Sequence, residues 1–245
     1  MTSPVAIIEF LGLPGSGKTT IANQLARHLC ASDVAVLTRS HALADERLVF
    51  QRHLKRARYV ISTAMRTPRP FLRALRLIRE DGQHSLRATL KVCWNLWCVM
   101  GWYGWLSRNH QGMVIVDQGL AQAVWSVRLS ALRAKADWVG FLRECGMIDA
   151  MVITDCDPSV LEARLSARDG QISRLSGRSL EDRYWQVAQN SFAEGCAEVE
   201  TLVPTMRVRN EITDDPAQLV KKIADWLWVL AAQKSWFEPE HSESA

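Results

Sequence analysis

The stretch FLGLPGSGKTTIANQLARHL, residues 10–29, places a glycine-rich loop directly before an amphipathic segment. The loop follows the apolar run VAIIEFLGL, whose β-branched residues are typical of a strand buried on both faces. Ile21, Leu25 and Leu29 then recur every four residues, which predicts a helix with one apolar face. The chain is therefore expected to begin with a strand, a tight loop and a helix.

Residues 12–19 read G-x-x-x-x-G-K-T, the Walker A pattern of a phosphate-binding loop. Glycines let successive backbone N–H groups point inward, and the helix N-terminus that follows also attracts anions. Lys18 is placed to reach the β- and γ-phosphates of a nucleotide, and the Thr19 hydroxyl to ligate Mg²⁺. We therefore predict ATP and Mg²⁺ as cofactors. The residues expected to bind the nucleotide are Gly12, Pro14, Gly15, Ser16, Gly17, Lys18, Thr19 and Thr20.

Further predicted strands alternate with helices along the chain, which indicates an α/β fold with a parallel sheet covered on both faces. The predicted strands after the first lie at residues 33–40, 113–119, 148–156 and 205–212. Ligands of such sheets bind at the carboxyl ends of the strands. Gly12, Arg39 and Asp117 all fall at that edge, so we expect them to lie close together.

Asp117 follows four apolar residues of a predicted strand, in the sequence MVIVDQG. Its carboxylate is placed to hold Mg²⁺ through water, or to orient or deprotonate a substrate hydroxyl. A cap on the next helix is the alternative interpretation.

Three arginines lead into a loop rich in serine and glycine. Arg164 and Arg168 share one helix face, and Arg174 follows them. Guanidinium groups match the geometry of phosphate oxygens, which favours a lid over the phosphates. The alternative is a solvated basic helix face.

The segments GLPGSGKTT, VIVDQG and DPSVLEARLSAR together resemble the nucleoside-monophosphate kinase group of P-loop proteins, thymidylate-kinase-like members especially. The resemblance implies a three-layer α/β/α P-loop NTPase fold with a five-stranded parallel sheet, a helical insertion that binds the acceptor, and an arginine-bearing lid. It implies that Lys18, Asp117, Arg164, Arg168 and Arg174 serve catalysis. The kinase core is expected at residues 1–40 and 111–235, the lid at 169–179, the insertion at 41–110, and a disordered tail at 236–245.

Gln118 departs from the thymidylate kinase pattern, which usually has Asp-Arg at this point. Because glutamine cannot neutralise a phosphate, the acceptor is expected to differ from thymidylate. Arg39, Asp117 and Gln118 are the predicted substrate-binding residues, and Thr19 and Asp117 the predicted metal ligands.

The functional hypothesis is an ATP-dependent phosphotransferase acting on a small-molecule acceptor. Two alternatives stay open: a nucleotide-dependent binding or regulatory ATPase that engages nucleic acid or a membrane, and a polynucleotide 5′-hydroxyl kinase. A GTPase is disfavoured, since no NKxD motif follows the third predicted strand.

The predicted insertion is strongly basic. Residues 41–91 hold 12 Lys/Arg and 4 Asp/Glu, a net charge of +8, against +4 for the whole chain. Arg66, Arg69, Arg73, Arg76 and Arg79 are spaced by three or four, which predicts one side of a helix broken near Pro70. Such a row is either a surface for an anionic partner or a solvated face.

The stretch LKVCWNLWCVMGWYGWL, residues 90–106, contains four of the ten tryptophans. A helix that is apolar all round is buried in protein or lipid. This stretch is shorter than the roughly 20 apolar residues that span a bilayer. We therefore expect a buried helix that walls the acceptor pocket, with an interfacial membrane contact or a homodimer interface as alternatives. The absence of CxxC pairs among the six cysteines, and of a signal peptide, predicts a cytoplasmic protein.

Overall fold

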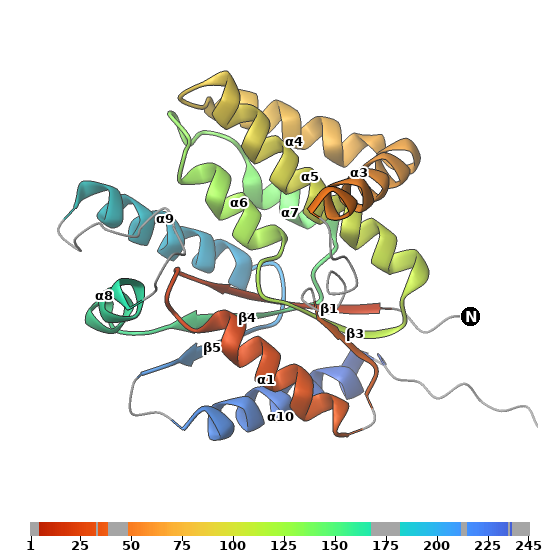
Figure 1. Ribbon diagram of the computed structural model, residues 1–245, viewed down its shortest axis with the longest axis vertical. Coiled ribbons are helices and arrows are strands. Elements are labelled where there is room, and N and C mark those ends of the chain that lie inside the picture. Colours follow the sequence, from red (N-terminus) through yellow and green to blue (C-terminus); the bar gives the residue numbers. More distant parts are fainter. Residues whose placement is uncertain are drawn as a thin grey trace, which may run out of the picture.

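The computed structural model describes residues 5–32, 34–38, 49–167, 182–211, 215–234 and 236 (Figure 1). Its centre is a sheet of five parallel strands in the order β2-β3-β1-β4-β5. The strands are β1 (Val5–Gly12), β2 (Val36–Thr38), β3 (Gly112–Val116), β4 (Ala150–Asp155) and β5 (Thr205–Arg209). The predicted five-stranded parallel sheet is confirmed.

Two helices cover one face of the sheet: α1 (Lys18–Cys30) and α10 (Pro216–Lys234). The predicted stripe of α1 is buried there, with Leu25 completely covered and packed in one cluster with Ile8 and Phe10 of β1. In Figure 1 both helices lie below the strands. Trp236 belongs to the same cluster and is 4% exposed, so ordered structure reaches into the segment expected to be a tail.

Helices α6 (Leu120–Arg128), α7 (Trp138–Cys145) and α9 (Arg183–Glu200) lie on the other side of the sheet, which completes the three layers (Figure 1). The short α8 (Pro158–Ser166) follows β4. Parallel strands buried on both faces need this arrangement, because each crossover returns the chain over the sheet.

Three helices form the insertion between β2 and β3: α3 (Val49–Arg66), α4 (Pro68–Asp81) and α5 (Leu86–Asn109). Two glycines of α5 let α3 come very close. A Cβ on Gly101 would lie 2.7 Å from the backbone nitrogen of Val60, and one on Gly104 would lie 2.3 Å from the Thr63 side chain. The Thr63 hydroxyl donates to the Gly101 carbonyl at 3.0 Å.

The tryptophan-rich stretch is part of α5 and is a buried helix, as the favoured interpretation predicted. Trp102 is buried, while Trp97 and Trp105 are half-buried against the helices around them. Trp105 stacks on Tyr59 of α3 with ring centroids 5.0 Å apart, and Trp97 meets Phe71 of α4 edge-on at 6.0 Å. Among the described residues, none of the helices is long and apolar enough to cross a bilayer.

The predicted helix break near Pro70 is confirmed, and it divides the row of five arginines between two helices. The helix break lies at Thr67, because Pro68 begins a new helix and Pro70 sits inside its first turn. Arg66 therefore belongs to α3 and the other four to α4. Arg73 forms ion pairs with Asp137, at 3.4 Å, and with Glu144, so it holds α4 against α7.

Candidate functional site

The loop between β1 and α1 presents free backbone donors. Gly15 and Gly17 have φ angles of 93° and 87°. Residues with a side chain rarely adopt such positive φ angles, whereas glycine adopts them readily. In the part of the chain that the structure describes, the backbone N–H groups of Gly15, Gly17, Thr19 and Thr20 donate to no carbonyl. Four such donors around a helix N-terminus form an anion site. The loop therefore fits a polyphosphate.

Ser16 connects this loop to the sheet. Its side chain is 1% exposed, and its hydroxyl lies 2.9 Å from that of Thr154 on β4. Its backbone N–H donates to the Leu13 carbonyl at 3.1 Å. Ser16 thus ties the loop to the sheet, and Pro14 has no N–H to donate.

The Lys18 ammonium lies at the start of the loop. It donates to the Gly12 carbonyl at 2.6 Å and to the Leu13 carbonyl at 3.0 Å, with the residue 9% exposed. The loop backbone therefore holds a positive charge beside its own free N–H groups. This is the place where the sequence predicted a phosphate-binding lysine.

Thr19 and Asp117 meet at the carboxyl edge of the sheet. The Thr19 hydroxyl donates to a carboxylate oxygen of Asp117 at 2.7 Å, although 98 positions separate them. Both predicted metal ligands are therefore brought together beside the loop. A hydroxyl and a carboxylate are oxygen donors of the kind that Mg²⁺ prefers, so the residues present fit that ion.

Asp117 does not cap the next helix, so that alternative is wrong. The cap position of α6 is Gly119, and Glu9 of β1 satisfies the helix N-terminus instead. Glu9 accepts the N–H groups of Leu120, at 2.5 Å, and Ala121, at 3.0 Å, and the Tyr103 hydroxyl at 2.6 Å.

Glu9 is completely buried and was missed in the sequence. Burial raises the pKa of its carboxyl group, while the three donors act in the opposite direction. A Cβ on Gly119 would lie 2.1 Å from the Glu9 carboxyl carbon, so the turn after Asp117 rests directly on this side chain. The only signal in the sequence was an acid inside a buried apolar run.

Glu9→Ala is expected to lower the free energy of unfolding by about 3 kcal/mol, because it removes the buried carboxylate that accepts hydrogen bonds from the Tyr103 hydroxyl and from two helix N–H groups. Urea unfolding measures the change. Glu194→Ala is the matched control, since Glu194 is 67% exposed and should change stability by less than about 1 kcal/mol. Equal stability of the Glu9→Ala and control proteins would contradict this role.

Arg164 lies behind the phosphate loop. Its guanidinium donates to the Asn210 carbonyl at 3.1 Å and to the Gly15 carbonyl at 3.5 Å. The Asn210 amide in turn donates to the Ser16 carbonyl at 2.8 Å. Arg164 and Asn210 together therefore hold the loop against α8 and β5. Arg39, Arg168 and Arg174 lie outside the described residues, as does the predicted lid.

A pocket of about 190 Å³ opens beside Asp117, between α3, α5 and α6. Gln118 and Gln122 line it, and the Gln122 side chain accepts the Gly12 backbone N–H at 3.4 Å, next to the phosphate loop. The tryptophan-rich helix α5 forms one wall. The pocket is lined by Arg56, Val92, Asn95, Cys98, Val99, Gln118, Gly119, Gln122, Ala123, Ser126 and Val127.

Arg56 of α3 is the one charged side chain among the described residues that line this pocket. Sequence reasoning missed it, because nothing in the sequence separates it from the other basic residues of the insertion. It supplies a cation to the pocket that Gln118 also lines.

Comparison with known proteins gives a family and a fold. A family model described as an AAA domain matches residues 7–193. No curated protein matches the sequence. At the level of three-dimensional structure, the chain is similar to deoxyadenosine kinase from M. mycoides, solved with dCMP and dCDP, at 13% identity and a TM-score of 0.52. That match covers 91% of this chain and 99% of the kinase.

Thymidylate kinase from Ehrlichia chaffeensis matches at 11% identity and a TM-score of 0.48, over 93% of this chain and 100% of the other. At 13% identity and a TM-score of 0.52, the match to deoxyadenosine kinase shows a shared fold and nothing finer. The predicted resemblance to P-loop kinases is confirmed at that level.

Proposed function

The chain belongs to the AAA domain family, and from that premise we propose that it is an ATP-dependent phosphotransferase that acts on a small-molecule acceptor. The observation that carries the proposal is the hydrogen bond between Thr19 and Asp117. It joins a loop with free anion-binding donors to the mouth of a pocket lined by amide side chains. A kinase fold shared with deoxyadenosine kinase supports the same conclusion.

In this proposal the N–H groups of the loop and the Lys18 ammonium hold the phosphates of ATP. Thr19 and Asp117 would hold Mg²⁺, and the bound ion would supply positive charge to the phosphate oxygens. Arg168 and Arg174 are proposed, from the sequence, to close over the phosphates. Arg164 keeps the loop in shape through its backbone carbonyls.

The acceptor is proposed to enter the pocket beside Gln118, with its hydroxyl toward Asp117. Amide groups of Asn95, Gln118 and Gln122 offer both donors and acceptors, and Arg56 offers a charged donor. Val92 and Val99 of α5 and Val127 of α6 form apolar parts of the pocket lining. This arrangement favours a compact polar acceptor.

A screen of nucleosides, nucleotides, sugars and small alcohols for ATP-dependent phosphorylation tests the proposal. With an accepted substrate in hand, Arg56→Gln is expected to raise the KM for the acceptor at least about tenfold, the value of one lost charged hydrogen bond, and to leave the KM for ATP unchanged. Arg58→Gln is the matched control, because Arg58 lies on the same helix but is exposed.

A changed KM for ATP in Arg56→Gln, or an unchanged KM for the acceptor, would place the acceptor elsewhere. Failure of every compound in the screen, with ATP still bound and hydrolysed, would favour the nucleotide-dependent binding ATPase.

A further inference from the structure

Helix α3 carries a row of large apolar side chains on its outer side. Phe50 is 74% exposed, Leu54 52%, Ile61 58% and Met65 80%. At 100° per residue these four positions fall within an arc of about 60° and extend over about 22 Å. They therefore form one continuous strip, which we call the outer face of α3.

The surroundings of this face are basic. Helix α3 contains five Lys/Arg residues and no Asp or Glu. Arg58 is exposed and lies next to the apolar strip, about 20° beyond its edge. Arg66 is also exposed, but it lies about 100° beyond the strip and donates to Ser62. The face thus combines apolar side chains with one adjoining positive charge on a helix that has no acid.

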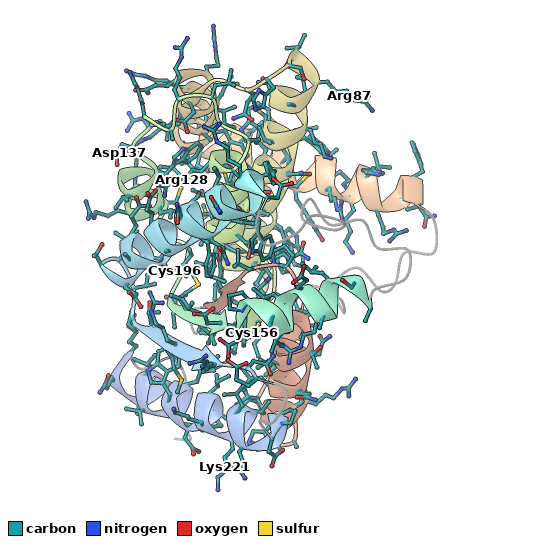
Figure 2. All side chains as sticks on the ribbon, turned by 90° about the vertical axis from the view of Figure 1, so that its left-hand side faces the viewer. Arg87, Arg128, Asp137, Cys156, Cys196 and Lys221 are labelled. Carbon is teal, nitrogen blue, oxygen red and sulfur yellow. The ribbon has the colours of Figure 1, made fainter. Side chains whose placement is uncertain are left out.

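The side of α3 opposite this strip is packed against the rest of the molecule. Val60 and Thr63 are buried against α5, and Arg56 lines the pocket. Figure 2 shows α3 lengthwise, in pale orange, extending away from the body of the molecule. The outer face is consequently presented along most of an 18-residue helix while the opposite side stays anchored.

We propose that the outer face of α3 docks on an anionic lipid surface, with the helix lying in the plane of the membrane. Apolar side chains enter the boundary between headgroups and acyl chains, and Arg58 meets a lipid phosphate, while the other cations of α3 add to the attraction of the anionic surface. This inference goes beyond the proposed phosphotransferase activity and does not depend on it.

Two other occupants fit less well. A nucleic acid would meet the charges but would gain nothing from four aliphatic and aromatic side chains in a row, since phosphate contacts supply its affinity. A second copy would place five cations of one α3 near five of the other without any acid on the helix to offset them. Charge complementarity therefore selects anionic lipid.

The test is flotation of the full chain with vesicles of phosphatidylcholine containing roughly a third phosphatidylglycerol, compared with phosphatidylcholine alone. The wild type is expected to float with the anionic vesicles and to lose most binding on the neutral ones. The triple variant Leu54→Gln, Ile61→Gln, Met65→Gln is expected to reduce partitioning about 100-fold, since three side chains no longer leave water.

Control variants show whether a loss of vesicle binding is specific to the outer face of α3 or follows from the removal of any exposed apolar side chain. Val187→Gln with Val229→Gln removes two exposed apolar side chains on α9 and α10 and should float as the wild type does. Arg58→Glu should weaken binding to anionic vesicles at least about tenfold and lower its salt dependence. Lys18→Ala should float normally, which keeps the result distinct from failure of the proposed phosphotransferase activity.

Unchanged flotation of the triple variant, or absence of flotation by the wild type, would overturn the proposal. So would a dimer in sedimentation that the triple variant abolishes, because the face would then join two copies. Salt-sensitive binding of a single-stranded oligonucleotide, retained by the triple variant in the absence of vesicle binding, would assign the basic surface to nucleic acid and also overturn it.

Discussion

Replacement of Lys18 by alanine is expected to lower the rate of phosphoryl transfer about a thousandfold or more, while the protein stays folded. The ammonium group lies against the carbonyls of Gly12 and Leu13, so it is already positioned beside the free N–H groups of the loop. Loss of this preorganised charge removes stabilisation of the negative phosphate oxygens in the transition state. Single-turnover transfer from ATP measures the effect.

Lys221→Ala is the control for this substitution, because Lys221 is an exposed lysine on α10, far along the chain from the loop (Figure 2). Circular dichroism should be the same for both variants. Full activity of folded Lys18→Ala would reject the assignment of the loop as the phosphate site.

The Asp117→Asn variant is expected to lose about a thousandfold in kcat with a smaller change in the KM for ATP. The substitution keeps the size of the side chain and its contact with Thr19 but removes the negative charge. If Asp117 holds Mg²⁺, as we propose, the variant needs about tenfold more Mg²⁺ for half-maximal rate. Titration of the rate with MgCl₂ at saturating ATP measures this requirement.

Asp225→Asn, on the exposed side of α10, is the control and should behave as the wild type does. An unchanged Mg²⁺ requirement, together with loss of the acidic limb of the pH–rate profile, would instead make Asp117 the base that takes the proton of the acceptor hydroxyl. Wild-type activity of Asp117→Asn would remove the residue from the site altogether.

The features that sequence predicted well are local. Glycines at fixed spacing, a β-branched run before them and a four-residue stripe after them specify the strand, loop and helix without reference to distant residues. The approach of Thr19 to Asp117 was also predictable, because parallel strands must bring their carboxyl ends to one edge.

The features that sequence did not predict depend on contacts between distant segments. Glu9 and Tyr103 are 94 positions apart, and Asn210 and Ser16 are 194 apart. Nothing in the local pattern around Tyr103 or Asn210 indicates such a partner. Arg164 shows the same limit: its helix was predicted, but only the packing of α8 against the loop shows that the guanidinium donates to backbone carbonyls.

The basic insertion gave a third kind of outcome. Its charge, its helical content and the break near Pro70 could be predicted from the sequence, but the partners of its arginines could not. Pro68 starts a new helix, and Arg73 forms ion pairs with the α7 cap residue Asp137 and with Glu144 of α7. The surface that the proposed phosphotransferase activity does not explain is the apolar outer face of α3. The exposed fractions of its side chains identify it, and the spacing of residues in the sequence did not.

We propose that residues 12–19 form a cup of backbone donors for the phosphates of a nucleotide, and the proposed activity depends on this cup. Isothermal titration of the folded protein with ATP in the presence of magnesium tests it most directly. The structure predicts saturable binding of one ATP per chain, lost in the Lys18→Ala variant. Absence of binding heat from correctly folded wild-type protein, across a range of temperatures, would contradict the claim and the function built on it.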